Sequence, residues 1–188
     1  MWFLTQEGVD RYDGKYIKHY NFSDDSIKLD SRIALNWLYM DSGNILWVIG
    51  QKGRIFRYDS QHDKFKLAYI HPELIRNKPQ AFLNYGYLDK NDRIWLCYKD
   101  SITWYDIRTG TTLHMPTPVN GEITAIEQTD SNHFFIGTGN GLFHAGIEKG
   151  KLNIMPDKMV EGIGTSVHEL YYHAVSKQLF VGNYKEGI

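Results

Sequence analysis

A short apolar segment with an aromatic residue near its centre recurs along the whole chain. The recurring aromatic residues are Trp2, Trp47, Trp95, Phe135 and Phe180. Successive copies are separated by 45, 48, 40 and 45 residues. A period of this length is typical of folds that stack one supersecondary unit on the next, so it constrains the architecture more than any other feature.

Polar turn residues come before each copy and predict a hairpin. Three residues ahead of the aromatic stand Asn44, Asp92, Asn132 and Lys177. Asn and Asp tolerate left-handed backbone or bond their own main chain, which favours tight turns. An extended apolar segment precedes each of these turns, at residues 33–40, 82–88, 123–128 and 167–172. Each aromatic segment is therefore expected to pair with the segment before it.

A second turn and two further strands complete each unit. The turn falls at Gly8, Gly53, Ser101, Gly141 and Gly187, and glycine is favoured where φ is positive. A third strand and then a fourth, such as 64–70, follow. Four short strands joined by tight turns form an antiparallel meander, and strands apolar on both faces are typical of sheets packed between neighbours. The sequence predicts an all-β fold, with one helix candidate at 72–77.

The repeat unit is thus expected to be a β-propeller blade, and the chain a partial ring of about four blades. The expected blades are 1–30 (incomplete), 31–78, 79–119, 120–164 and 165–188 (incomplete). We expect both ends to face further chain or another molecule, since an open arc leaves sheet faces uncovered. Analogy with related folds indicates seven blades for the full ring.

The repeat resembles a known family, the two-component regulator propeller repeat. The segments that carry the resemblance are Leu46–Asp59 and Phe135–Phe143, which read LWVIGQKGRIFRYD and FIGTGNGLF. The resemblance implies the periplasmic sensor region of a hybrid two-component histidine kinase that detects oligosaccharides and signals to transcription. It also implies a segment without catalysis or cofactor. Its expected partners are an oligosaccharide, the remaining blades and downstream domains, and a second copy in a homodimer.

Composition excludes several other classes. The formal net charge is −1, without the basic excess of a nucleic-acid binder. The apolar runs are too short for a membrane span, so no membrane contact is expected within this segment. Cys97 is the single cysteine, which rules out an internal disulfide framework, and its apolar surroundings predict a buried thiol.

Motifs that would carry chemistry have plainer explanations. His168 and His173 are five residues apart on an expected strand, which points them to opposite faces rather than to one metal. The glycine-rich segment 137–141 precedes a strand, whereas phosphate loops precede a helix. The acidic segment 89–93 aligns with the other hairpin turns and lacks the later ligands of a calcium loop. We therefore expect no catalytic, cofactor or metal residues.

Two sets of aromatic residues differ in their expected role. Trp47, Trp95, Phe135 and Phe180 are expected to fill the core between blades. A second set lies on the first strands of two blades, near the propeller axis, and its rings can stack on sugars: Trp37, Tyr39, Tyr85 and Tyr87. They are the candidate ligand-binding residues, with packing or channel lining as the alternative.

Two other functions remain open at this stage. One is a scaffold that binds proteins through its rim or face. The other is a propeller lyase or hydrolase, which needs acid and base groups to converge on the inner strands. The candidate groups for that chemistry are Glu122, Glu127, His168 and Glu169.

Overall fold

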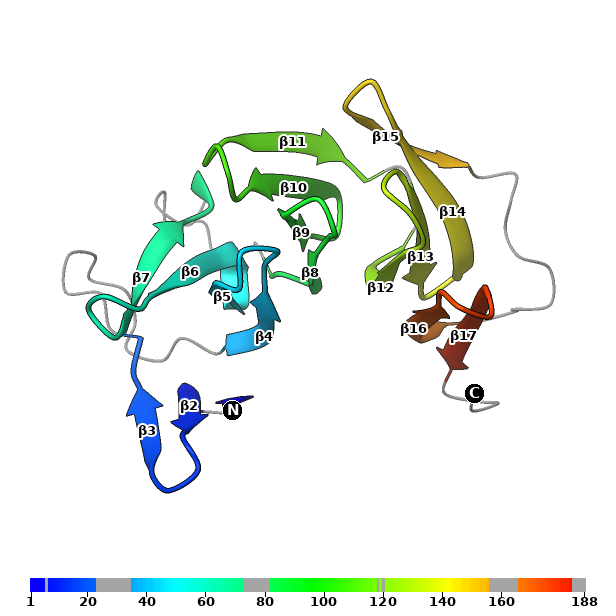
Figure 1. Ribbon diagram of the computed structural model, residues 1–188. Helices are drawn as coiled ribbons and strands as arrows, with labels where there is room; N and C mark the ends of the chain where they lie inside the picture. The colour runs from blue at the N-terminus through cyan, green and yellow to red at the C-terminus, as the bar shows by residue number, and fades with distance from the viewer. Residues whose placement is uncertain are drawn as a thin grey trace. The chain divides into compact units, whose positions relative to one another are not determined.

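The computed structural model describes residues 1–5, 7–22, 35–72, 82–117, 119, 121–155 and 166–183. Within them the chain is built almost entirely from antiparallel strands, as predicted (Figure 1). Residues 73–77 of the helix candidate lie outside the described residues. The limits between the expected blades fall on or beside residues outside these ranges, and they stay predictions.

In the described residues, five antiparallel sheets follow one another along the chain. The first has the order β1 (Trp2–Leu4), β2 (Val9–Tyr12), β3 (Ile17–Tyr20), and the second β4 (Leu35–Met40), β5 (Leu46–Gly50), β6 (Arg54–Asp59), β7 (Lys64–Tyr69). The third has the order β8 (Tyr85–Leu88), β9 (Arg93–Cys97), β10 (Ser101–Asp106), β11 (Thr112–Pro116). The fourth is β12 (Ile123–Gln128), β13 (His133–Thr138), β14 (Gly141–Glu148), β15 (Lys151–Met155), and the fifth β16 (Val167–His173), β17 (Gln178–Asn183). A single 3-10 turn, Gln51–Gly53, joins β5 to β6.

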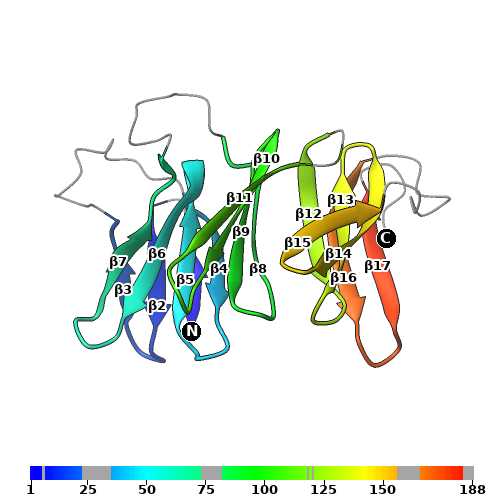
Figure 2. The same cartoon turned by 90° about the horizontal axis from the view of Figure 1, so that it is seen from above.

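The chain divides into two compact units, Met1–Leu88 and Asp89–Ile188. In the first unit, β1 packs on the second sheet: Trp2 and Leu4 contact a core formed by Val9, Val48 and Phe56. In the second unit, β13 lies beside β16 of the fifth sheet (Figure 2). Phe135 of β13 packs on a core that Val167 of that sheet helps to form. Face-to-face stacking of consecutive four-stranded sheets is the arrangement of propeller blades, so the predicted fold class is confirmed.

The turn chemistry follows the sequence pattern. Asn44, Asp92 and Lys177 have φ of 60°, 60° and 56°. Of the four residues that stand three positions before a recurring aromatic, these three therefore have a left-handed backbone conformation. This conformation costs Asp and Asn little free energy, because their short side chains form hydrogen bonds to the nearby backbone. Gly53 and Gly141 have φ of 76° and 135°, as expected for the second turn.

An aspartate holds the indole ring in the second and third sheets; Asp41 of the second is half-buried and Asp89 of the third is buried. Asp89 accepts hydrogen bonds from the Asn91 and Arg93 backbone N–H groups at 2.9 and 3.0 Å, and its other oxygen accepts from Trp95 Nε1 at 2.9 Å. Asp41 binds Trp47 Nε1 in the same way at 2.7 Å. One side chain thus closes the turn and satisfies the buried N–H of the ring that fills the core.

The expectation that all four later aromatics are core residues is only half right. Trp47 and Trp95 are buried, and Trp95 lies 4.9 Å from Phe134, ring centre to ring centre. Phe135 is only half-buried, and Phe180 is 45% exposed. Burial of this position requires a sheet stacked beyond it, and no described sheet follows the one that carries Phe180. The fully buried ring in the fourth sheet is Phe134 instead.

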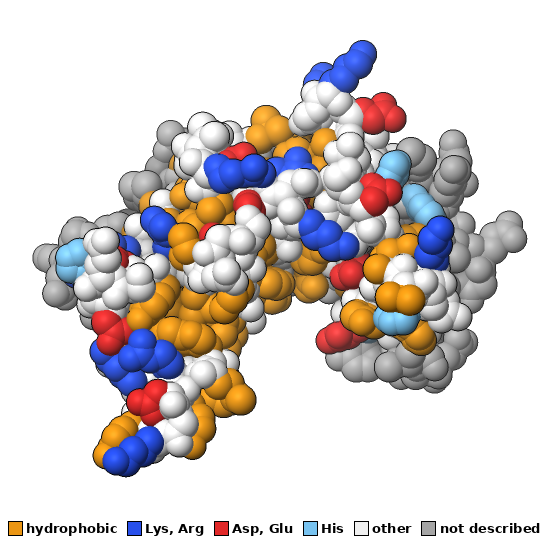
Figure 3. All heavy atoms as spheres, in the orientation of Figure 1, with side chains coloured by type: hydrophobic (Ala, Val, Ile, Leu, Met, Phe, Trp, Pro, Cys, Tyr) orange, Lys and Arg blue, Asp and Glu red, His pale blue; other side chains and the backbone are white. Residues whose placement is uncertain are grey.

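Asp63 links the first two sheets through a cluster of polar contacts. Its carboxylate accepts hydrogen bonds from the Tyr20 and Tyr58 hydroxyls at 2.6 and 2.5 Å, and it pairs with Lys18 and Arg11. In Figure 3, Lys and Arg side chains lie beside carboxylates at the β2–β3 end of the first unit. The Lys18 ammonium, followed by the two hydroxyls, holds the pKa of Asp63 well below its usual value of 3.8.

This lowered pKa predicts acid sensitivity. Because the carboxylate is favoured in the folded state, its contribution to stability is fully present above its usual pKa of 3.8 and is lost as the pH falls below that value. We expect Asp63→Asn to reduce the loss of stability between about pH 5 and pH 2, measured as the urea midpoint at each pH. Equal pH slopes for the variant and the parent would contradict the assignment.

Candidate functional site

The four candidate aromatics come together in the first unit. Trp37 and Tyr39 lie on β4, and Tyr85 and Tyr87 lie on β8, which contacts β4. Trp37 meets Tyr85 edge-on at 5.8 Å between ring centres, and Tyr39 meets Tyr87 edge-on at 6.5 Å. All four side chains are half-buried. We call these four residues the aromatic ladder.

Gly86 gives the ladder its close spacing. A Cβ atom at Gly86 would lie 2.9 Å from Cε3 of Trp37 and 3.0 Å from Cδ1 of Ile49, closer than a side chain tolerates. The Gly86 carbonyl also accepts a hydrogen bond from the Tyr39 hydroxyl at 2.8 Å. A β-bulge between Leu35 and Trp37 shifts the register of β4 against β5 ahead of these rings. Backbone contacts therefore fix the indole and the first phenol in place.

The ladder has the properties of a stacking surface. Edge-to-face pairs of this separation are favourable in themselves and restrict ring rotation. Half-buried Trp and Tyr rings offer apolar faces with polar tips, a combination suited to sugar rings, which carry hydroxyl groups around an apolar face. Packing between the first strands also explains the ladder, because Tyr39 uses its hydroxyl to join β4 to β8.

Two of the acid and base candidates of the second unit, Glu127 and His168, form hydrogen bonds to neighbouring groups. Glu127 accepts a hydrogen bond from the Tyr172 backbone N–H at 3.3 Å, and burial raises the pKa of its carboxyl. His168 Nε2 lies 2.7 Å from the Ser166 hydroxyl. Glu122 and Glu169 are exposed. These hydrogen bonds of Glu127 and His168 go to different residues.

Glu127 has a role that the sequence reasoning missed. It pairs with Phe135, as Tyr39 pairs with Trp47, and both lie eight residues before the recurring aromatic. Each of them binds the backbone of the first strand of the following sheet. Their shared offset from the aromatic was the signal in the sequence that could have identified this equivalence.

The remaining motifs adopt the structures expected of them. His168 and His173 lie on β16, and His173 contacts Ser176 rather than His168. Thr138 pairs with Gly141 across the β13–β14 hairpin, so the glycine-rich segment is a hairpin turn. No group of three or more His, Cys, Asp or Glu side chains is placed to hold a metal ion in the part of the chain that the structure describes. Cys97 is fully buried, which raises the pKa of its thiol.

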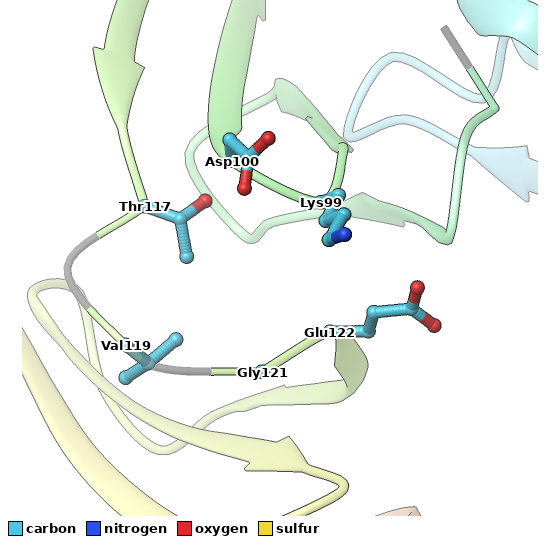
Figure 4. A pocket seen from close by; sticks show the side chains of 6 residues that line it. All are labelled: Lys99, Asp100, Thr117, Val119, Gly121 and Glu122. Atoms are coloured by element: carbon cyan, nitrogen blue, oxygen red, sulfur yellow. The ribbon is translucent and has the colours of Figure 1, made fainter. Parts of the chain in front are cut away.

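A cavity of about 210 Å³ opens in the second unit, and none of the ladder residues lines it. Lys99 and Asp100 line it from the β9–β10 turn (Figure 4). The connection from β11 to β12 supplies the other lining residues, which are Thr117, Val119, Gly121 and Glu122. Of these residues the sequence analysis named only Glu122, because the two segments are brought together by the fold and share no motif.

Comparison with solved structures identifies the same fold. The chain aligns with two extracellular domains assigned to hybrid two-component systems of B. thetaiotaomicron, at 20% and 14% identity and TM-scores of 0.67 and 0.68. These alignments cover 100% and 96% of this chain. A third similar structure is virginiamycin B lyase from Staphylococcus aureus, with 16% identity, a TM-score of 0.68 and 96% of this chain covered. At such identities the likeness establishes the β-propeller fold.

The chain corresponds to a part of each of these proteins. It spans 27% and 24% of the two extracellular domains and 58% of the lyase. No protein-family model and no curated protein sequence matches it. Among the described residues, no helix has both the length and the apolar character needed to cross a bilayer.

Proposed function

We propose that this chain is a ligand-binding segment of an extracytoplasmic sensor propeller in a hybrid two-component histidine kinase, and that it detects oligosaccharides. The observation that carries the proposal is the aromatic ladder, whose four half-buried rings are held edge-to-face. The repeat resemblance supports the sensor assignment. The two extracellular domains of hybrid two-component systems with the same fold support it further.

We propose binding rather than catalysis for this segment. A lyase or hydrolase needs an acid and a base within reach of one reacting atom. Glu127 instead bonds the Tyr172 backbone, and His168 bonds Ser166. Among the described residues, no comparable set of ordered groups favours the alternative of a protein-binding scaffold.

The proposed setting is the periplasm. There the segment would act with the rest of its propeller and with downstream domains, as one subunit of a homodimer. Ligand binding would favour one of two arrangements of the dimer, and the differential affinity would set the size of the response. Ultracentrifugation of the whole extracytoplasmic region with and without oligosaccharide tests this part.

Calorimetry with a panel of plant and host oligosaccharides tests the ligand class. We expect one glycan group to bind, and Trp37→Ala to weaken that binding about tenfold, the loss of roughly 1.4 kcal/mol of stacking. Trp37→Phe keeps a ring and is expected to retain most of the affinity.

Tyr16→Ala is the matched control. Tyr16 is an exposed aromatic in the β2–β3 turn, outside the ladder, so its removal should leave glycan affinity unchanged. Thermal unfolding of each variant shows whether weaker glycan binding comes from the missing ring or from loss of the fold. Binding that is equally strong in folded Trp37→Ala would remove the ladder from the site, and the absence of any glycan ligand would overturn the oligosaccharide assignment.

A further inference from the structure

We propose that the cavity lined by Lys99, Asp100, Thr117, Val119, Gly121 and Glu122 binds a small zwitterion with an ammonium and a carboxylate group, such as a free α-amino acid. This site lies in the second unit and is independent of the ladder and of its proposed glycan. We call it the loop cavity.

A backbone hydrogen bond joins Thr117 to the turn that carries Lys99 and Asp100. Lys99 and Asp100 form a tight turn closed by a hydrogen bond from the Tyr98 N–H to the Ser101 carbonyl at 2.8 Å. The Thr117 N–H donates to the Asp100 carbonyl at 3.0 Å, which ties the second wall to this turn. Thr117 is thus held beside Lys99 and Asp100 before any ligand arrives, which lowers the entropic cost of binding.

One lining residue of the loop cavity has an unused hydrogen-bonding group. Thr117 Oγ1 is buried and has no hydrogen-bond partner among the described residues. A buried hydroxyl without a partner costs free energy, and it would reach a ligand in the cavity if the Thr117 side chain turned toward it. Val119, which is buried, supplies the apolar part of the lining.

The glycine at position 121 lets the backbone of the second wall pass close to the cavity. Gly121 has φ of 126°, a conformation that side chains rarely adopt, and a Cβ there would lie 3.0 Å from Nδ2 of Asn140. The chain can therefore turn closely past the cavity only with glycine at this position.

The charges of the lining indicate the ligand class. Figure 4 shows the Lys99 ammonium and the Asp100 and Glu122 carboxylates placed around the opening. None of the three side chains forms an ion pair with another described residue. An ammonium group of a ligand suits the two carboxylates, and a carboxylate of the same ligand suits Lys99.

Other ligands fit the loop cavity less well. Its volume of about 210 Å³ is below the range of pockets that take drug-sized ligands, so the ligand is small. A sugar ring would need an aromatic wall, and Val119 is the apolar side chain of the lining. A divalent cation would be repelled by Lys99, and a simple anion by the two carboxylates.

Titration calorimetry of the whole chain with glycine, alanine and serine tests the proposal. We expect millimolar binding of these amino acids, and at least tenfold weaker binding of methylammonium or acetate, each of which carries half of the recognised groups. Lys99→Met and Glu122→Gln should each weaken amino-acid binding about tenfold.

Lys151→Met is the matched control, because Lys151 is an exposed lysine of the same unit outside the cavity. It should bind amino acids as the parent does, and so should Trp37→Ala, which separates this result from the glycan proposal. Absence of binding at about 50 mM amino acid, or binding unchanged by both Lys99→Met and Glu122→Gln, would overturn the assignment. Equal binding of glucosamine would show that no ligand carboxylate is recognised and would also overturn it.

Discussion

Replacing Asp89 with alanine is expected to lower the free energy of unfolding by about 4 kcal/mol. The substitution removes the acceptor for two turn N–H groups, for the buried Trp95 indole and for Arg93 Nε, which lies 2.8 Å from the carboxylate. A buried donor that loses its partner costs about 1–3 kcal/mol, and here several are lost at once. Water reaches the site poorly, because Asp89 is only 2% exposed.

Urea unfolding of Asp89→Ala measures this effect, and Asp130→Ala is the matched control. Asp130 accepts the Asn132 and His133 N–H groups in the corresponding region of the next hairpin, but it is exposed and binds no indole. Its loss should cost less than about 1 kcal/mol. Trp95→Phe, which removes the indole N–H together with part of the ring, should fall between the two. Similar losses for Asp89→Ala and Asp130→Ala would show that the indole bond contributes little.

Gly137→Ala should destabilise the second unit by about 3 kcal/mol, although it adds a single methyl group. A Cβ atom at Gly137 would lie 2.5 Å from Cγ1 and 3.0 Å from Cβ of Val167, and 3.3 Å from Cβ of Ala125. All three residues are buried where the fourth and fifth sheets meet. Neither neighbour has a flexible side chain that could move aside, so the strands themselves must separate.

Gly139→Ala provides the control within the same hairpin. A Cβ at Gly139 has no atom within 4 Å, so this variant should unfold at nearly the same urea concentration as the parent. Val167→Ala should cost less in the Gly137→Ala background than in the parent, since it relieves the clash, and the double-mutant cycle measures that difference. Strict additivity of the two substitutions would contradict the packing described.

The strand pattern and turn chemistry were predictable because they depend on residues close in sequence. The left-handed positions at Asn44 and Asp92 follow from side chains that suit such turns, and β12 has the limits expected from its apolar run. The exposure of Phe180 and the half-burial of Phe135 were not predictable in this way. Burial of each ring depends on the sheet that lies opposite it, which the local pattern does not encode.

The two candidate sites differ in the same way in how far they could be predicted from the sequence. The ladder was found from sequence because its residues occupy repeated positions on first strands, but the contact of Gly86 with Trp37 required the structure. The loop cavity was missed because Lys99 and Glu122 belong to different connections. Nothing in their spacing shows that the Thr117 backbone joins the two walls.

Among the described residues, every strand pairing joins neighbours along the chain, each strand forming a hairpin with its predecessor. Closing a hairpin requires only a short loop, which costs little chain entropy and is fast. A sheet of this kind can form during synthesis as soon as its own strands have left the ribosome, before any later part of the chain exists. Each completed sheet would then protect the nascent protein from misfolding. Only the face on which the next sheet packs would be exposed.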